Sequence, residues 1–369
     1  MQILDSAALS AALERIHEAG VPGVFAEVRD GDDVWRGAAG VADLDTRAPV
    51  TAELRHRVGS ITKTFTAAAV LRQVEAGRLG LDTPVARYLP KLVPGDTITV
   101  RMLINHTSGL AEYLPYAYPS LKAFPDLANT TPQSFDDHRF TRFDALELIR
   151  LGVDAPRTGN PGGSPGFYSN TNYLLLGELL AHVTGTTAED CITRDVIERA
   201  GLRDTGFPTG TEVEGPHSRL YESWFGLLDP PRDYSVFDMS WVGPAAALIS
   251  TVADLNRFYR LLLDGEIVSQ ESLAQMRNTV KVVSQEGRII DYGLGLHPAE
   301  TPGGPGFWGH GGTVWGGGAL AMTHAEDRRQ LALAVNRQRW NELDDAGRPQ
   351  PHPIDHALAA FTRLAMGQG

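Results

Sequence analysis

The sequence predicts an α/β fold of the α+β type, in which helices flank a mainly antiparallel sheet built from both ends of the chain. Two observations lead to this expectation. Segments with strand character lie near both termini, and the middle consists mostly of helical segments separated by loops rich in Pro, Asp and Gly. We therefore expect a discontinuous sheet domain at 1–80 and 241–369, a mostly helical domain inserted at 81–240, and a site at their seam.

The first 80 residues predict a helix, a hairpin and a second helix. Apolar residues recur at helical spacing before the stop signal Gly20, and the turn sequence Gly31-Asp32-Asp33 separates two strand-like runs. A further apolar stripe begins just after Ser60. These elements are expected at 5–19, at 21–29 paired with 34–41, and at 60–77.

The remaining elements follow from the same periodicities. Helices are the clearest prediction in the middle of the chain, and strands with β-branched or small residues return near its end. We expect helices at 143–151, 172–183, 252–264 and 354–366, and strands at 288–296, 317–323 and 331–335.

Composition excludes several classes of protein. The 369 residues carry a net charge of −12, which argues against a nucleic-acid partner because phosphates require a basic surface. The single cysteine, Cys191, cannot form an internal disulfide, and no apolar run approaches the roughly 18–20 residues that span a bilayer. The start of the chain lacks the basic and apolar regions of a signal peptide, so we expect a cytoplasmic protein that does not bind membranes.

The most specific motif is Ser60-Ile61-Thr62-Lys63. If Ser60 opens a helix, Lys63 lies one turn later on the same face, within reach of the serine hydroxyl. An amine kept neutral by burial can take the serine proton and activate the hydroxyl as a nucleophile. The alternative is a helix cap followed by a solvated lysine. The chain has only four lysines and no other Ser-x-x-Lys pair, which favours the catalytic interpretation.

Two further motifs have simple structural alternatives when each is taken alone. Tyr168-Ser169-Asn170 places a phenol and an amide just before a predicted helix, where they could move protons and hold a lysine, or serve only as an aromatic and a cap. His310-Gly311-Gly312-Thr313 combines an imidazole with glycines that permit close backbone approach, or is an ordinary glycine-rich hairpin.

Together and in this order, the three motifs resemble those of the serine β-lactamase and penicillin-recognising D-alanyl-D-alanine carboxypeptidase superfamily. The forms that the second and third motifs take in this chain resemble those of the branch that contains class C β-lactamases, carboxypeptidases, D-aminopeptidases and esterases. The runs at 105–110 and 292–296 are also familiar from that branch, and the resemblance covers about residues 10 to 365. It implies a β-lactamase/transpeptidase-like fold with its active site at the domain seam.

The resemblance implies acyl transfer through an acyl-Ser60 intermediate, with no metal or cofactor. Lys63 and Tyr168 would share the general base and acid roles, Asn170 would orient Lys63 and the substrate amide, and His310 would tune the proton network. The backbone N–H groups of Ser60 and Thr313 would form the oxyanion hole. Trp241, Gly311 and Gly312 would contact the substrate, although a core position for Trp241 is an equal alternative.

Two departures weaken the recognition of a substrate carboxylate. Carboxypeptidase-like relatives carry a basic residue just after the strand that ends at Leu296, whereas this chain has His297-Pro298-Ala299-Glu300. A threonine that often helps bind the carboxylate is replaced by Gly311. We therefore expect an ester, amide or thioester substrate without a terminal carboxylate.

Three other patterns are expected to be coincidental. The run 162–166 spells a Gly-x-Ser-x-Gly elbow but lacks the required strand before it, and 304–309 spells a dinucleotide fingerprint without a following helix. His352 and His356 have the spacing of metal ligands, but Pro353 between them favours a helix start.

The sequence is compatible with several functions. The first is a hydrolase of a small-molecule ester or amide, or of a peptide containing D-amino acids. The second is a cytoplasmic transacylase or peptide-cyclising enzyme of the same fold, and D-alanyl-D-alanine carboxypeptidase activity is a further alternative. The third is a ligand sensor without turnover, which the complete set of Ser60, Lys63, Tyr168 and Asn170 disfavours.

Overall fold

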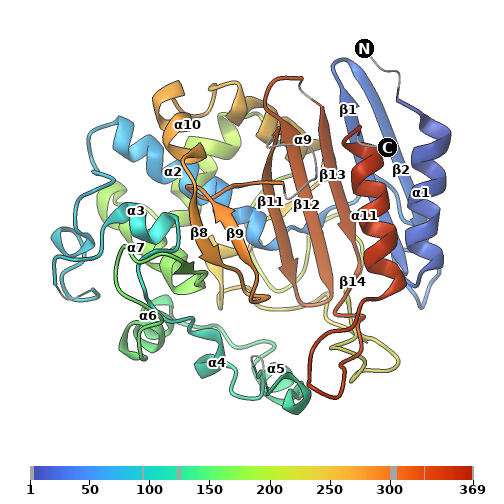
Figure 1. Ribbon diagram of the computed structural model, residues 1–369, viewed down its shortest axis with the longest axis horizontal. Helices are drawn as coiled ribbons and strands as arrows, with labels where there is room; N and C mark the ends of the chain where they lie inside the picture. Colours follow the sequence, from blue (N-terminus) through green and yellow to red (C-terminus); the bar gives the residue numbers. More distant parts are fainter. Residues whose placement is uncertain (1–3, 94, 123–125, 300–305, 328, 368–369) are drawn as a thin grey trace.

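A six-stranded antiparallel sheet forms the centre of the molecule, with the order β10-β11-β12-β13-β1-β2 (Figure 1). The computed structural model describes residues 4–93, 95–122, 126–299, 306–327 and 329–367. Strand β1 from the start of the chain pairs with β13 from its end, so the predicted sheet built from both ends, and with it the fold class, is confirmed. The strands are β1 (Gly23–Asp30), β2 (Asp33–Gly40), β10 (His297–Pro298), β11 (Phe307–Val314), β12 (Gly317–His324) and β13 (Gln330–Val335).

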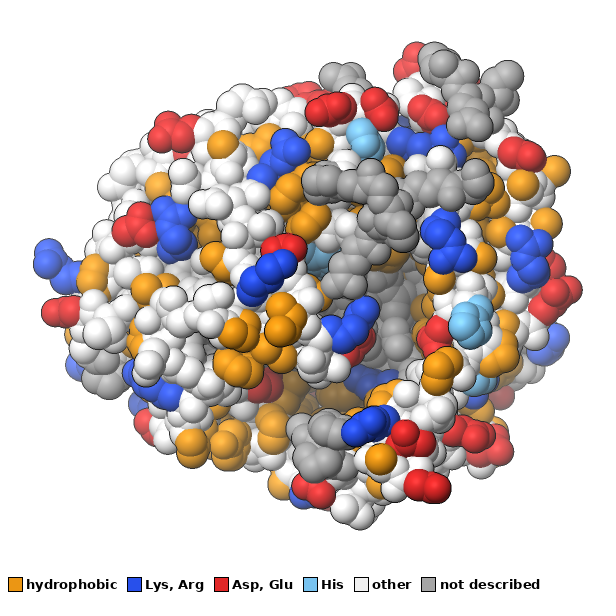
Figure 2. Space-filling view, viewed as in Figure 1, with side chains coloured by type: hydrophobic (Ala, Val, Ile, Leu, Met, Phe, Trp, Pro, Cys, Tyr) orange, Lys and Arg blue, Asp and Glu red, His pale blue; other side chains and the backbone are white. Residues whose placement is uncertain are grey.

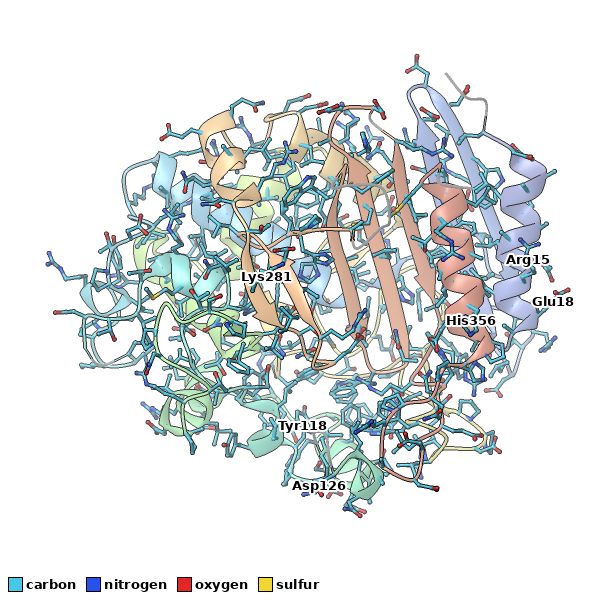
Figure 3. The ribbon with its side chains drawn as sticks, in the orientation of Figure 1. Arg15, Glu18, Tyr118, Asp126, Lys281 and His356 are labelled. Carbon is cyan, nitrogen blue, oxygen red and sulfur yellow. The ribbon has the colours of Figure 1, made fainter. Side chains whose placement is uncertain are left out.

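Helices from the two ends of the chain cover one face of this sheet. α1 (Ser6–Glu18) packs against β1 and β2, and α11 (Pro353–Ala365) packs against α1 and β13 (Figure 1). Leu9, Leu13 and Ile16 point inward from α1, whereas its Arg15 and Glu18, like His356 of α11, lie on the outer side (Figure 3). α9 (Val252–Leu263) packs against the opposite face, on β12, β13 and β1.

The middle of the chain is mostly helical, as predicted, and packs around one long helix. That helix, α7 (Asn170–Thr184), contacts α2 (Thr62–Glu75), which carries Lys63 in its first turn. Nearly all residues of α2 and α7 are buried, so both helices are surrounded by other parts of the protein on almost every side. The other helices of this region are η2 (Val85–Arg87), α3 (Val100–Ile104), α4 (Leu114–Ala117), η3 (Asp126–Asn129), α5 (Gln133–Asp137), α6 (Ala145–Asp154), α8 (Ala188–Ile192) and η4 (Thr193–Glu198).

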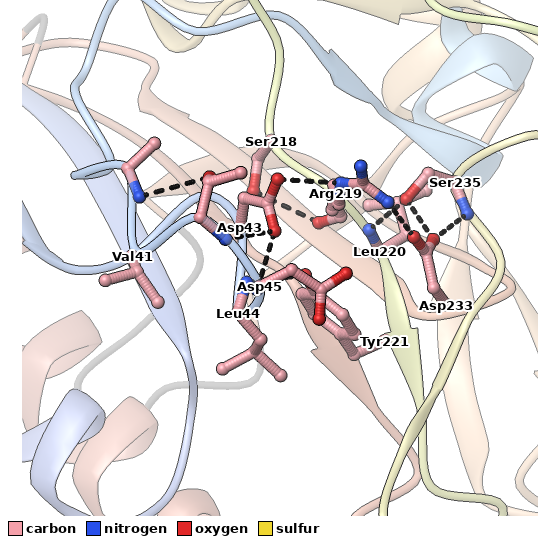
Figure 4. Close-up of polar contacts among 12 residues, drawn as sticks. Val41, Asp43, Leu44, Asp45, Ser218, Arg219, Leu220, Tyr221, Asp233 and Ser235 are labelled. Carbon is pink, nitrogen blue, oxygen red and sulfur yellow. Dashed lines mark hydrogen bonds and ion pairs between the residues drawn. The ribbon is translucent and has the colours of Figure 1, made fainter.

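The end of this middle region is joined to the sheet. β5 (Tyr221–Glu222) pairs with β6 (Arg232–Asp233) and, in parallel, with β14 (Arg337–Gln338). The Arg219 guanidinium bridges Asp43 and Asp233, and the backbone N–H of Leu44 donates to the Tyr221 hydroxyl at 2.8 Å (Figure 4). Residues 219–233 are therefore bound to segments from both ends of the chain, namely 43–44 and β14. The domain boundary at 240 stays a prediction.

The predicted strand at 288–296 is present only in its first part, as β9 (Ile289–Tyr292). β9 pairs with β8 (Val280–Val283), and β8 pairs in turn with β4 (Gly166–Phe167), in a sheet separate from the six-stranded one. The segment then turns, because Gly293 N–H donates to Leu296 O and Gly295 adopts a left-handed φ of +77°. η1 (Gly59–Ile61) forms the start of the helix predicted at 60–77. Elements outside the predicted ranges include η5 (Gly243–Ala245), α10 (Gln270–Arg277), β3 (His56–Arg57), β7 (Ile249–Ser250) and β11.

The coincidental patterns have structural explanations. Ser164 lies on an exposed bend that no strand precedes, and the 304–309 pattern begins outside the described residues and continues into β11. His352 caps α11. Its ring Nδ1 accepts from the backbone N–H of Ile354 at 3.2 Å, and its backbone N–H donates to the Asp355 carboxylate at 2.9 Å. Within the described ranges no helix is long and apolar enough to cross a membrane.

The cap at His352 gives a prediction for stability. His352→Ala removes the acceptor for the first turn of α11 and should lower the free energy of unfolding by about 1 kcal/mol in urea titrations. His356→Ala, at an exposed position on the same helix, is the control and should leave stability nearly unchanged. Equal losses for the two variants, or a loss of stability on adding a chelator to the unmodified protein, would contradict the capping role.

Candidate active site

The structure brings Ser60, Lys63 and Asn170 into direct contact. The Lys63 amine is fully buried and lies 3.0 Å from Ser60 Oγ, 2.7 Å from Asn170 Oδ1 and 3.0 Å from Ala245 O. These partners come from η1, the start of α7 and η5, so three separate parts of the chain converge on one nitrogen atom.

The three neighbours of Lys63 define how its amine can act. Asn170 Oδ1 and Ala245 O can only accept hydrogen bonds, so they hold two N–H groups in either protonation state of the amine. The third direction faces Ser60 Oγ. In the neutral amine this direction carries the lone pair, which can accept the serine proton.

Burial supplies the neutral amine. Desolvation lowers the pKa of Lys63 to about 7, and the negative charge of Glu112 partly opposes this shift. An amine with a pKa near neutrality is deprotonated in a large fraction of molecules and is suited to general base catalysis.

Glu112 holds the amide of Asn170 in this orientation. One of its oxygens accepts from both the backbone N–H of Asn170, at 2.8 Å, and the side-chain Nδ2, at 3.0 Å, while the other accepts from Leu114 N–H at 3.2 Å. With Nδ2 donating to Glu112, Oδ1 must face Lys63. Burial raises the pKa of Glu112, and the three N–H donors together with the Lys63 charge oppose that rise.

Tyr168 lies on the other side of the lysine. Lys63 Nζ is 4.9 Å from the centroid of its ring, and the nearby Ser60 hydroxyl acts to lower the pKa of the Tyr168 hydroxyl. Burial raises the pKa of Tyr168 well above its usual value of 10, so the side chain remains a neutral phenol. A neutral phenol at this place can give a proton to the leaving group, the oxygen or nitrogen atom that departs from the carbonyl carbon attacked by Ser60.

His310 belongs to a cluster of aromatic rings next to Tyr168. Its Nδ1 is hydrogen-bonded to the Gly311 carbonyl, which only accepts, so Nε2 accepts from the Tyr292 hydroxyl at 2.9 Å. Burial first, and then the neighbouring His297 and Lys63, lower the pKa of His310 well below 6.5. The ring is thus a neutral imidazole, with its centroid 6.5 Å from that of Tyr168.

The edge of β11 near Ser60 offers unpaired backbone groups. On the β10 side, Ala299 N–H donates to Phe307 O at 2.9 Å. Because the backbone groups of an antiparallel strand alternate between its two edges, the N–H of Thr313 faces the same side. β10 extends only opposite 308–309, so among the described residues no strand covers this edge at Thr313.

Two glycines allow η1 to approach that edge. A Cβ on Gly312 would overlap the carbonyl oxygen of Val58, and a Cβ on Gly59, whose φ is +56°, would overlap the backbone of Thr313. The backbone N–H groups of Ser60 and Thr313 can approach one another only because both side chains are absent.

The remaining predicted residue, Trp241, is not among the residues that line the cavity at Ser60. Its side chain is 4% exposed and its indole N–H has no hydrogen-bond partner among the described residues. It packs in an aromatic cluster with Tyr118, Phe237 and Trp315, at ring-centroid distances of 6.0, 6.3 and 5.1 Å. The contact between Trp241 and a substrate stays a prediction.

Sequence reasoning missed several residues of the site. Glu112 is marked in the sequence only as an acid between the apolar Ala111 and Tyr113, and Ala245 acts through its backbone. His106 lies in the run 105–110 that the resemblance marked, but no role was assigned to it there: its ring stacks on Tyr168 at 4.1 Å and accepts from the N–H of Ser169 at 3.2 Å.

A cavity of about 470 Å³ opens at Ser60 and is lined by Tyr168, Tyr292, His310 and 311–313. Among the described residues that line this cavity, Arg288 is the only arginine and there is no lysine. Its guanidinium forms an ion pair with Glu286 at 2.7 Å. The described part of the chain brings no three His, Cys, Asp or Glu side chains close enough to hold a metal ion.

The fold and this geometry are those of a serine acyl-transfer enzyme, and comparison with known proteins gives the family. The Beta-lactamase family model matches residues 9–352, so the chain belongs to the beta-lactamase family. This confirms the predicted relationship and the prediction of a serine hydrolase that acts on amides or esters.

Individual relatives are hydrolases of similar architecture. A D-stereospecific amidohydrolase from Streptomyces sp. is 34% identical with a TM-score of 0.79, and the match covers 91% of this chain and 95% of that protein. A D-aminopeptidase from Cereibacter sphaeroides is 29% identical over 91% of this chain, which spans only 61% of that relative. The D-amino acid amidase from Ochrobactrum anthropi SV3, at 22% identity and a TM-score of 0.79 over 98% of both chains, shares the fold.

The environment of Lys63 predicts how the reactivity of Ser60 depends on pH. The rate of Ser60 modification by a fluorophosphonate, followed by intact-protein mass spectrometry, should rise through a pKa of about 7 as Lys63 loses its proton. Glu112→Gln removes the negative charge that raises this pKa, so the transition should move to lower pH.

Glu14→Gln, at an exposed position on α1, is the matched control and should leave the transition in place. A transition that stays in place in Glu112→Gln, or that moves equally in both variants, would show that the titrating group is not Lys63.

Proposed function

We propose that the protein hydrolyses amides or esters of small molecules or D-amino-acid-containing peptides through an acyl-Ser60 intermediate. The observation that carries this proposal is the position of the Lys63 amine, whose only neighbour able to give it a proton, among the three to which it is hydrogen-bonded, is Ser60 Oγ. The preference for the D configuration rests on the names of the relatives, a D-stereospecific amidohydrolase and a D-aminopeptidase.

Acylation follows from the contacts of Lys63, Ser60 and Tyr168. Lys63 Nζ takes the hydroxyl proton of Ser60 while Oγ bonds to the carbonyl carbon of the substrate. The bond between this carbon and the leaving oxygen or nitrogen then breaks. Tyr168, a neutral phenol, gives its proton to the leaving atom and regains one from the Lys63 ammonium.

The negative charge that develops on the carbonyl oxygen falls between the backbone N–H groups of Ser60 and Thr313. In the second half of the reaction a water molecule replaces the leaving group. The water oxygen bonds to the acyl carbon while one of its protons passes to the neutral Lys63 amine. The bond from this carbon to Ser60 Oγ then breaks, Lys63 returns the proton to Oγ, and the acid leaves. Asn170 and Glu112 act by holding Lys63, and His310 acts on the network beside Tyr168.

The first experiment tests the nucleophile and the stereochemistry. The protein should hydrolyse D-alanine p-nitroanilide at least about tenfold faster than the L isomer, and Ser60→Ala should abolish both activities. A Ser60→Ala protein that still turns over the substrate or still forms a covalent adduct would refute the acyl-Ser60 intermediate. Equal rates for the two isomers would refute the D preference alone.

The transacylase alternative is decided by the products. With an ester donor and an added primary amine, a hydrolase releases the free acid at every amine concentration. A product that becomes an amide as amine is added would identify a transferase instead. Efficient release of D-alanine from D-alanyl-D-alanine peptides would support the carboxypeptidase alternative.

The oxyanion hole gives an independent prediction. Gly312→Ala forces β11 away from η1 and should lower kcat by about 100- to 1000-fold, the usual loss for one oxyanion donor. Gly210→Ala, at a position with open space around it, is the control and should keep full activity. Retention of activity in Gly312→Ala, with an unchanged circular dichroism spectrum, would contradict the role of Thr313.

A further inference from the structure

The cavity at Ser60 does not end at the catalytic residues. It continues over β11 onto the sheet face that α11 partly covers, where its lining includes Leu320, Leu333, Leu358 and Met366. Its volume of about 470 Å³ falls in the range of small-molecule binding sites. The same face of the molecule is visibly hollowed near its centre (Figure 2).

Gly311 opens the passage between the two parts of this cavity. In the sheet register Gly311 lies opposite Leu320, and Leu320 lies opposite Leu333, so the three side-chain positions form a row on one face. A Cβ at Gly311 would meet only atoms at 3.9 Å, which shows that open space lies above it. Two strand spacings of about 4.8 Å give this row a length of roughly 10 Å.

The far side of the cavity is a stripe of α11. Leu358, Thr362 and Met366 recur every fourth residue and therefore lie on one side of this end of the chain. α11 packs against α1 and β13, and among the described residues it does not extend over β12 and β11 beside it (Figure 1). Leu320 and Leu358 are only half-buried, so the floor and the wall both present apolar surface to the cavity.

The path of the cavity decides which part of a substrate it can hold. It leaves Ser60 along Tyr168 and His310, and Tyr168 is the group that gives a proton to the leaving atom. The leaving group must therefore begin beside Tyr168 and point toward Gly311. On its other side the site is bounded by Ser60 and Thr313, whose N–H groups bind the carbonyl oxygen.

We propose that the substrate carries an extended apolar chain on its leaving group, the alcohol or amine, and that this chain lies over Gly311 between the sheet face and α11. The inference rests on the proposed function. It defines the substrate class as acyl derivatives of long-chain or similarly apolar alcohols and amines. Burial of each methylene group in such a groove increases the affinity severalfold.

The test compares two series of esters with the intact protein. In acetate esters of methanol, butanol and octanol only the leaving group grows, and kcat/KM should rise by about tenfold or more along this series. In methyl esters of acids with the same chain lengths only the acyl group grows, and kcat/KM should rise far less.

Variants in α11 separate the groove from the catalytic centre. Leu358→Trp fills the groove and should lower kcat/KM for octyl acetate far more than for methyl acetate, which removes the advantage of the longer ester. Ala359→Trp, at the adjacent exposed position, is the matched control and should keep the preference. Thr362→Phe replaces Leu358→Trp if that variant does not fold.

Each outcome separates this inference from the function on which it rests. Hydrolysis of acetate esters without dependence on the alcohol chain would overturn the inference alone, as would equal losses on methyl and octyl acetate in Leu358→Trp. A protein that hydrolyses no member of either series would overturn the proposed function and this inference with it.

Discussion

The site depends on one buried amine and the three oxygen atoms around it. Lys63 has no contact with water, and two of its neighbours are oxygens that only accept hydrogen bonds. Burial makes the charged form costly and the negative charge of Glu112 offsets only part of this cost, so the amine can give up its proton near neutral pH. Ser60 lies in the remaining direction. Packing of α2 against α7 and η5 therefore sets the chemistry, because these elements supply the atoms that hold the amine.

A second constraint is the close approach of β11 to η1. Ordinary side chains at Gly59 and Gly312 would keep the two backbones apart, and the Thr313 N–H would then no longer face the serine. Gly311 has a different role, because its missing side chain leaves open space instead of relieving a clash. Neighbouring glycines in one strand thus act on two properties of the enzyme, namely the stabilisation of negative charge and the room for the leaving group.

The sequence predicted the architecture well where local pattern and tertiary structure agree. The helix containing Lys63, the hairpin of β1 and β2 and the helix that begins at Asn170 were all expected. The prediction failed for the segment before β10, where turn geometry at Gly295 outweighed its strand character. Glu112 and the carbonyl of Ala245 could not be found in this way, because their roles arise only when distant segments meet around Lys63.

The central claim is that Lys63 is a neutral amine when it faces Ser60. With only four lysines in the chain, NMR of protein labelled at the lysine side-chain carbons should resolve each one, and Lys63→Met identifies the signal of interest. We expect this signal to titrate with a pKa of about 7. A Lys63 signal that titrates only near the ordinary lysine pKa of about 10.4 would contradict it.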